Sequence, residues 1–233
     1  EKDASGKPVP SDSISLSKGM NRVAWDFRHQ GFEGVAGLFL LGGTQGRLVT
    51  PGQYTVRLTV GEASATTSLE VRPDPRFVHS GQDYAAQERM AATLQGHLTD
   101  LFGSVRKLRA AREQIKSVVA RAEGRPGHGE LKTAADVLEK QMQEAEERLV
   151  QPRSTTFQDV VNFTSQLDAQ LLQLLGTVDG AAPPLTGGQQ ERFRDLERLW
   201  ATEQSVLERL LGAELAGFNA RVQRLGIPAV VPR

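Results

Sequence analysis

Histidine is the residue type in this chain best suited to acid–base or metal chemistry. None of the histidines lies in an HExxH motif or an equivalent ligand spacing, and because the chain has no cysteine, a zinc site would need three distant groups to converge. No GxSxG elbow, Walker loop or GxGxxG before a helix occurs, and the glycines at 42–46 lack the lysine and helix that phosphate binding requires. We predict no catalytic, cofactor-binding or metal-binding residue, although the chain carries His29, His79, His97 and His128.

Trp25 and Asp26 are the neighbours that come closest to a carbohydrate site, since glycoside chemistry uses carboxyl groups and sugar rings stack on aromatic side chains. Apolar and polar residues alternate over 23–27, which is the period of a half-buried strand and points Trp25 and Asp26 to opposite faces. We therefore expect Trp25 in a core, and Asp26 outside or bonded to a turn. In the alternative, Trp25, Tyr54 and the loop 34–46 are exposed as a sugar platform.

The run 105–112 has the pattern of a basic amphipathic helix, which can bind nucleic acid, calmodulin-like grooves or lipid. Its basic residues lie as far before the turn at Pro126 as a set of acidic residues lies after it, and no aromatic residue is interleaved. Antiparallel packing would place these opposite charges side by side, so we expect a solvated helix face. We expect Arg112 to extend outward or to reach Glu139. The acidic set is Glu139, Glu144, Glu146 and Glu147.

The composition limits the partners of the chain. Its 28 basic and 28 acidic residues cancel, so no overall field favours nucleic acid or an anionic membrane surface. Without cysteine, disulfide and thiolate chemistry are excluded. No apolar run reaches the roughly 18–20 residues that a membrane span requires. We predict no nucleic-acid partner, no membrane span and no cofactor, and 39% hydrophobic residues are enough for packed cores in a chain of 233 residues.

Alternating apolar residues predict strands at 13–17, 23–27, 54–60 and 67–71. Pro51-Gly52 fits a type II turn that starts the third strand, and residues 61–64 fit a tight turn before the fourth. The glycine-rich stretch 31–50 is typical of an irregular crossover that covers one end of a sandwich, with a binding loop as the alternative. Residues 3–6 have the composition of a turn between strands, so we expect that a preceding strand has been cut away.

The apolar period changes after Pro73-Asp74-Pro75, which can continue neither a strand nor a helix. A heptad seam typical of one long helix begins near Ser80, and the same spacing resumes after breaks at 123–129, 151–154 and 181–184. We expect the later helices at 131–149, 160–178 and 186–225, with Thr186 capping the last. The first and last helices should be on the order of 55–60 Å long, and the two between them about half of that.

Two short helices in series match the length of one long helix. We therefore favour an antiparallel bundle of three legs whose middle leg is broken at Pro152, with a four-helix bundle as the alternative. The predicted fold class is α+β multidomain, a small antiparallel immunoglobulin-like β-sandwich followed by this bundle. The expected parts are a sandwich at 1–73 with a truncated first strand, a linker at 74–81, the bundle at 82–225 and a C-terminal tail at 226–233.

The stretches GMNRVAWDFRHQGF, LVTPGQYTVRLTV and LEVRPDPR precede the helices, and FNARVQRLGIPAVV comes near the end of the chain. In this order they resemble the C-terminal part of large bacterial exported proteins whose N-terminal part is a sortilin-like, BNR-repeat β-propeller, often described as glycosyl hydrolases. The β region also resembles the immunoglobulin-like domain of the flagellar hook-capping protein, which likewise runs from an Asn-x-x-Trp-Asp strand to a Pro-Gly-x-Tyr strand. The resemblance covers nearly the whole chain.

This resemblance implies a non-catalytic C-terminal structural or interaction module of a periplasmic or extracellular protein, which docks onto or braces its own upstream propeller. The sialidase-type Asp box, Ser-x-Asp-x-Gly-x-x-Trp, does not occur here, so no catalytic residue is carried over. The chain itself is therefore predicted not to be an enzyme, and the sequence leaves open whether the full-length protein is a glycosyl hydrolase. The alternative is an ancillary carbohydrate-binding or activity-completing domain, with another protein or a polysaccharide as the partner.

Overall fold

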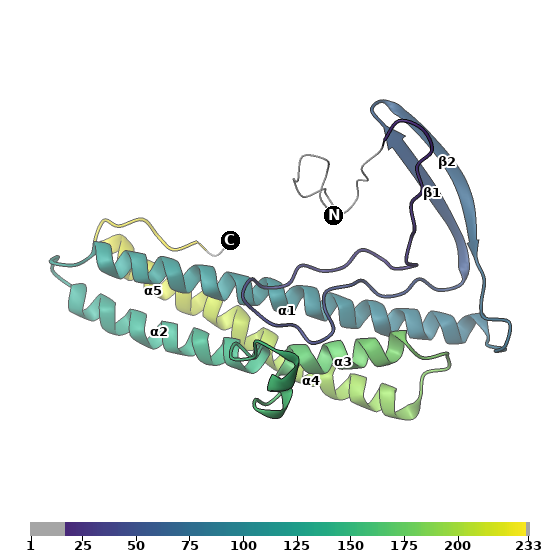
Figure 1. The fold of residues 1–233 in the computed structure, drawn as a ribbon. Helices are drawn as coiled ribbons and strands as arrows, with labels where there is room; N and C mark the ends of the chain where they lie inside the picture. Colours follow the sequence, from purple (N-terminus) through teal and green to yellow (C-terminus); the bar gives the residue numbers. More distant parts are fainter. Residues whose placement is uncertain (1–16, 232–233) are drawn as a thin grey trace.

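Residues 17–231 are described by a computed structural model, which combines a β-hairpin with a long helical bundle (Figure 1). The α+β class is therefore confirmed. The turn expected at 3–6 and the strand expected at 13–17, apart from Ser17, lie outside the described residues.

The hairpin consists of the antiparallel strands β1 (Gly52–Val60) and β2 (Ala63–Val71). Gly61 lies in the turn between them with a φ of 58°, a left-handed conformation that glycine adopts without steric cost. β1 falls where the alternation of apolar residues predicts it, whereas β2 begins at Ala63, four residues before its predicted start, because Ala63 and Ser64 pair with β1 and do not belong to the turn. Within residues 17–231 the sheet has these two strands, and the second layer of an immunoglobulin-like sandwich is not among the described elements.

The strand predicted at 23–27 is wrong. Residues 20–26 form no ladder with the hairpin, and in the described part of the chain the isolated β-bridge outside the hairpin joins Arg28 to Leu48. Phe27 has a φ of 60°, which a residue with a Cβ rarely adopts and which cannot occur in a regular strand. The backbone therefore leaves the extended conformation at Phe27, the last residue of the predicted strand.

The first helix, α1 (Gly81–Arg121), is 41 residues long, which corresponds to about 60 Å. Ser80 caps its N-terminus in a capping box with Asp83, where the heptad pattern predicts the start. The chain reverses at a short turn in which Gly127 has a φ of 87°, and α2 (His128–Leu149) follows.

The next helix, α3 (Leu167–Asp179), starts seven residues later than its predicted start at Val160. Val160 lies instead in a short 3-10 helix (Phe157–Val161) within the connection between α2 and α3. The last leg is continuous, because α4 (Gly187–Arg209), a π-helical turn (Leu210–Glu214) and α5 (Leu215–Arg224) follow one another without interruption. Thr186 caps it in a capping box with Gln189, as predicted.

The helices form three antiparallel legs (Figure 1). Helices α2 and α3 lie in series along α1, and α4 and α5 together run the length of the bundle. The bundle thus follows the three-legged arrangement, with its middle leg broken between Leu149 and Leu167.

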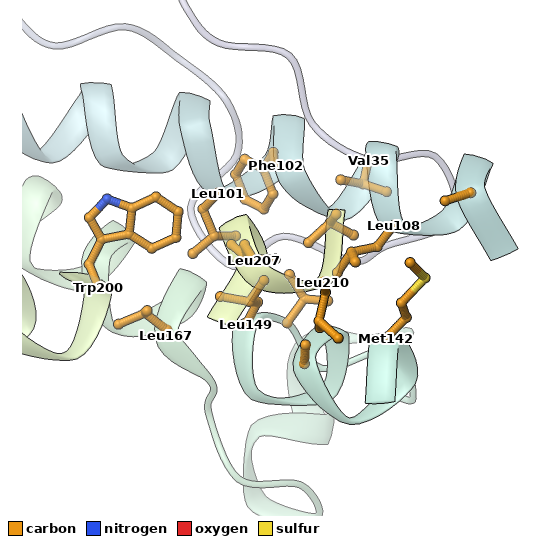
Figure 2. Packing of buried hydrophobic residues seen from close by; sticks show 14 of the residues in the cluster. Val35, Leu101, Phe102, Leu108, Met142, Leu149, Leu167, Trp200, Leu207 and Leu210 are labelled. Atoms are coloured by element: carbon orange, nitrogen blue, oxygen red, sulfur yellow. The ribbon is translucent and has the colours of Figure 1, made fainter. Parts of the chain in front are cut away.

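The hydrophobic core of the described residues lies between these legs (Figure 2). Leu101 and Leu108 of α1 face Met142 and Leu149 of α2 and Leu210 of the last leg, and all five side chains are buried. Other core residues come from outside the helices. The loop residues Phe32 and Val35 belong to the same cluster, with Leu38 and Leu40 packed against it. The apolar part of the stretch 31–50 thus covers the helices and does not plug a sandwich.

Candidate docking surface

Residues 27–49, here called the strap, fold back on themselves along α1. The two halves of the strap are joined by backbone hydrogen bonds, from Val49 N to Phe27 O at 2.8 Å and from His29 N to Arg47 O at 2.9 Å. Two glycines make this close approach feasible. A Cβ at Gly31 would lie 2.2 Å from the Thr44 carbonyl oxygen, and one at Gly46 would lie 2.0 Å from that of His29. The strap therefore requires glycine at both positions.

Asp179 anchors the strap to the end of α3. Its carboxylate accepts a hydrogen bond from Arg28 Nη1 at 2.9 Å and from the Leu48 backbone N–H at 2.9 Å. Asp179 is the last residue of α3, where the helix dipole disfavours a negative charge, so these donors compensate for an unfavourable position. Arg28 also donates to the carbonyl of Gly46 at 2.8 Å. Both halves of the strap thus converge on one carboxylate.

Further anchors attach the strap to α1. Arg47 Nε donates to Glu88 Oε1 at 2.9 Å, and the Arg47 backbone N–H donates to Gln95 Oε1 at 3.0 Å. Phe32 stacks on Phe102 of α1 with ring centroids 5.9 Å apart. Because charged, polar and aromatic contacts all join the strap to the bundle, the strap behaves as part of the bundle.

The arginines of the basic run on α1 bind groups of the same chain. Arg106 donates to the carbonyls of Glu33 and Gly34, and Arg109 donates to that of Ala36. Arg109 and Arg112 also bind Glu146 of α2, at 2.7 and 2.8 Å. The antiparallel charge pairing predicted for this run is confirmed for Glu146. The specific partner expected for Arg112, Glu139, is wrong, because Arg112 reaches across the helix interface to Glu146.

The side of the hairpin that carries its apolar residues, here called the apolar face, is exposed. On β1 it comprises Tyr54, Val56, Leu58 and Val60, whose partners across the hairpin are Leu69, Thr67, Ala65 and Ala63. Val56, Leu58 and Val60 are 46%, 48% and 53% exposed. The other side carries polar residues on both strands, Gln53, Thr55, Arg57 and Thr59 on β1 and Ser64, Thr66, Ser68 and Glu70 on β2. This is the pattern of a sheet that buries one side and solvates the other.

Trp25 lies at the base of the apolar face. Its ring meets Tyr54 edge-on with centroids 5.7 Å apart and lies 5.2 Å from Phe27, while its Nε1–H donates to the Arg28 carbonyl at 3.0 Å. Trp25 is 40% exposed and Phe27 48%, so the prediction of a core position for Trp25 is wrong. The reason is that no second layer covers this side of the hairpin among residues 17–231.

The histidines do not form a common site. His29 lies 3.6 Å from Glu88, His79 packs between the rings of Phe77 and Tyr84, and His128 begins α2. His97 lies beside Trp200 at the interface of α1 and α4, where burial lowers its pKa against the opposing influence of the carboxylates of Glu197 and Asp100. Among residues 17–231, no group of three or more potential ligands is placed to hold a metal ion.

Asp168 is a buried titratable group that the sequence pattern does not reveal. It lies in the first turn of α3, where desolvation raises its pKa to about 6 although the backbone N–H groups of Ala169 and Asp168 itself oppose the shift. The sequence does carry one indirect signal, because an acidic residue in the first turn of a helix is common. Asp168 lies in the first turn because α3 begins at Leu167, and the heptad spacing instead predicts a start at Val160.

The bundle surface is hollowed in several places. A hollow of about 420 Å³ at the base of the hairpin is lined by residues that include Tyr84, Glu88 and Asp179. The carboxylate of Asp179 and Oε1 of Glu88 bind arginines of the strap, whereas Oε2 of Glu88 is buried without a hydrogen-bond partner among the described residues. A groove of about 510 Å³ between α2 and α5 is lined by residues that include Val137 and Phe218.

None of the helices described between residues 17 and 231 combines the length and the apolar character needed to cross a bilayer. The apolar face, with Trp25 at its base, exposes several large apolar side chains on one side of the hairpin and is therefore the candidate docking surface. No family model, no curated protein and no solved structure matches this chain.

Proposed function

We propose that this chain is a non-catalytic interaction module. The apolar face docks onto a β-rich region of the same polypeptide, and the helical bundle acts as a rigid brace. The observation that carries the proposal is the exposure of Val56, Leu58 and Val60 on a hairpin whose other side is polar. Such contiguous apolar surface, rimmed by polar residues, is typical of protein interaction sites.

The energetics of a hairpin favour a covering layer. An isolated two-stranded hairpin is at best marginally stable in water, and a further layer is needed for independent stability. Full burial of a valine or leucine side chain contributes about 1.5–3 kcal/mol relative to exposure. Half-exposed Val56, Leu58 and Val60 therefore leave several kcal/mol to be gained when the face is covered. We propose that the covered form is an immunoglobulin-like sandwich with β1 and β2 in one of its sheets.

The strap supports the role of a brace. It leads directly from Trp25 and Phe27 into contacts with α1 and α3, and then continues into β1. The hairpin base is thereby joined to the bundle through charged anchors at both halves of the strap. Helix α1 is about 60 Å long. Because it is fixed to the hairpin base, its far end would keep a defined direction relative to the partner that the hairpin binds.

The resemblance to exported propeller proteins suggests the identity of the partner. In this proposal the β-rich region is an upstream propeller of the sortilin-like, BNR-repeat type, and the whole protein is periplasmic or extracellular. Any glycosyl hydrolase activity of the whole protein would then belong to the upstream region. Arg28 pairs with Asp179 and Arg47 pairs with Glu88. This ion pairing supports a non-catalytic role for the chain described here.

Carbohydrate binding is a second candidate function, favoured by the partial exposure of Trp25 and Phe27. Exposed aromatic rings can stack on the faces of sugars. A sugar site also needs polar groups placed to bind hydroxyls, whereas the surface that continues from Trp25 along β1 carries Val56 and Leu58. This continuity favours a protein surface as the ligand.

The proposal is tested by mixing the purified chain with the separately expressed upstream region and following their association by sedimentation velocity. We expect a one-to-one complex. A lack of association at high micromolar concentration would overturn the docking role. In parallel, the chain alone is incubated with a panel of chromogenic glycosides and titrated with oligosaccharides. Turnover that one carboxylate substitution abolishes would overturn the non-enzymatic role, and sugar binding that Trp25→Ala abolishes would establish the second candidate instead.

A further inference from the structure

Both edges of the two-stranded hairpin are open. In the part of the chain between residues 17 and 231, the backbone hydrogen bonds of β1 and β2 join the two strands to each other, and none runs from either strand to another segment. A strand at the edge of a sheet presents a row of unpaired N–H and C=O groups that a further strand can bind. The hairpin therefore offers one strand-binding edge on β1 and another on β2.

The turn determines which backbone groups point to these edges. Gly61 and Glu62 form a two-residue loop, which is closed by hydrogen bonding between Val60 and Ala63. Along an antiparallel ladder, hydrogen-bonded pairs alternate with pairs that are not bonded to each other, so the N–H and C=O groups of every second residue point outward. The outward residues of β2 are Ser64, Thr66, Ser68 and Glu70, and those of β1 are Gln53, Thr55, Arg57 and Thr59.

The composition of β2 leaves its edge unprotected. Natural edge strands are commonly blocked by charged side chains or proline. Arg57 lies in the middle of β1, whereas Glu70 is the one charged residue of β2, lies near its end and pairs with Arg72. Residues 63–68 of β2 are all exposed. The β2 edge can therefore accept a strand along most of its length.

The β1 edge is less open, because the chain that precedes β1 stays close to this strand. Phe27 accepts a hydrogen bond from Val49, shortly before β1 begins, and Trp25 contacts Tyr54 within β1. A strand that approached the β1 edge would meet this part of the chain. The β2 edge is thus the better place for an added strand.

We infer that an extended strand of the partner adds to the β2 edge, so that the hairpin becomes part of a larger sheet. In this mode of recognition main-chain hydrogen bonds provide the affinity, which suits a β-rich partner. The added strand also gives the hairpin the third strand that independent stability requires. The inference deepens the proposed function and rests on it, because it names the edge through which the partner that covers the apolar face is bound.

Amide exchange followed by NMR tests the edge residue by residue and needs no variant. In the chain alone the outward amides of β2 should exchange fast. Slow exchange there would overturn the inference, because a strand of this chain would already occupy the edge. When the proposed upstream β-rich partner is added, we expect these amides to slow at least about tenfold while the outward amides of β1 keep their rates. Unchanged rates on β2, or equal slowing at both edges, would overturn the inference.

A matched pair of proline variants provides the second test. Thr55 and Ser68 lie opposite each other and their N–H groups point outward, so proline removes a donor from one edge and leaves the ladder between the strands in place. We expect Ser68→Pro to weaken binding of the same partner at least about tenfold, and Thr55→Pro to bind as the original chain does. Equal affinities of the two variants would overturn the inference.

The two tests separate this inference from the proposed function. If the original chain forms a complex in sedimentation but both tests fail, the role of the β2 edge is removed and the docking function stands. If the original chain forms no complex, the docking function is overturned and this inference with it.

Discussion

Arg28 and Asp179 are 151 positions apart in the sequence, and Arg28 Nη1 donates to Asp179 Oδ2 at 2.9 Å. The same carboxylate receives the Leu48 backbone N–H, so one side chain at the end of α3 holds both halves of the strap. The hairpin base is connected to the bundle through this contact and through the pair between Arg47 and Glu88.

Asp179→Ala should release the strap. The substitution leaves the Leu48 N–H without an acceptor and leaves Arg28 with the Gly46 carbonyl but no counter-charge, which costs about 2–3 kcal/mol in a partly buried site. Urea denaturation followed by circular dichroism measures the cost, and hydrogen exchange of residues 28–48 should become faster. Asp195→Ala is the control, because Asp195 pairs with Arg198 on the exposed side of α4 and should cost less than about 0.5 kcal/mol. Equal effects of the two variants would contradict the role of Asp179.

Glu146→Ala should destabilise the bundle by about 3–5 kcal/mol. Glu146 is 5% exposed and binds both Arg109 and Arg112, so its removal leaves two guanidinium groups without a counter-charge at the interface of α1 and α2. Chemical denaturation measures the free energy of unfolding. Glu144, which lies near Lys140 on the exposed side of α2, provides the matched control Glu144→Ala. A cost below about 1 kcal/mol for Glu146→Ala would show that the two arginines find other partners.

Asp168 should make stability depend on pH in an unusual direction. Its pKa is raised to about 6 from 3.8, so the folded state holds this proton more tightly than the unfolded state does. The contribution of Asp168 to stability is therefore most favourable below about pH 4 and is lost as the pH rises to about 6. Burial of the charged form then costs about 2–3 kcal/mol at neutral pH.

Asp168→Asn removes this titration. We expect the variant to exceed the original chain in stability at pH 7 by up to about 2–3 kcal/mol, with the difference vanishing near pH 3. Urea denaturation of both proteins at several pH values gives the comparison. A difference that does not change with pH would contradict the raised pKa.

Trp25 and Trp200 should respond differently to truncation. Trp200 is 2% exposed in the core between α1 and α4, so Trp200→Ala should cost about 3–5 kcal/mol. Trp25 is 40% exposed and packs mainly on Tyr54 and Phe27, so Trp25→Ala should change the stability of the bundle by less than about 1 kcal/mol. Thermal and chemical unfolding compare the two. Similar costs for both would mean that Trp25 is covered in solution by residues of this chain.

The helices were accessible to prediction because their signals are local. Heptad spacing, the capping box at Ser80 and the cap at Thr186 act within a few residues and give the right helix starts. The alternation along β1 and β2 is equally local. The start of α3 was misplaced because Val160 continues the apolar spacing, although residues 157–161 form a 3-10 helix.

The contacts of the strap were not predictable from such patterns. Arg28 and Asp179 meet across 151 positions, and nothing in the residues around either one indicates the other. The exposure of Trp25 has a related cause. Alternation correctly identifies residues suited to one apolar side, but whether that side is covered depends on a second layer that the pattern of 23–27 does not supply.

The central claim is that the apolar face is the docking surface of this chain, and matched lysine variants on β1 test it most directly. Leu58→Lys places a charge on the apolar face, and Thr59→Lys places the same charge one residue away on the polar side. The affinity of each variant for the proposed upstream β-rich partner is measured by sedimentation. We expect Leu58→Lys to weaken binding at least about tenfold, a loss of about 1.4 kcal/mol or more, while Thr59→Lys binds as the original chain does. Equal affinities for the two variants would contradict the claim.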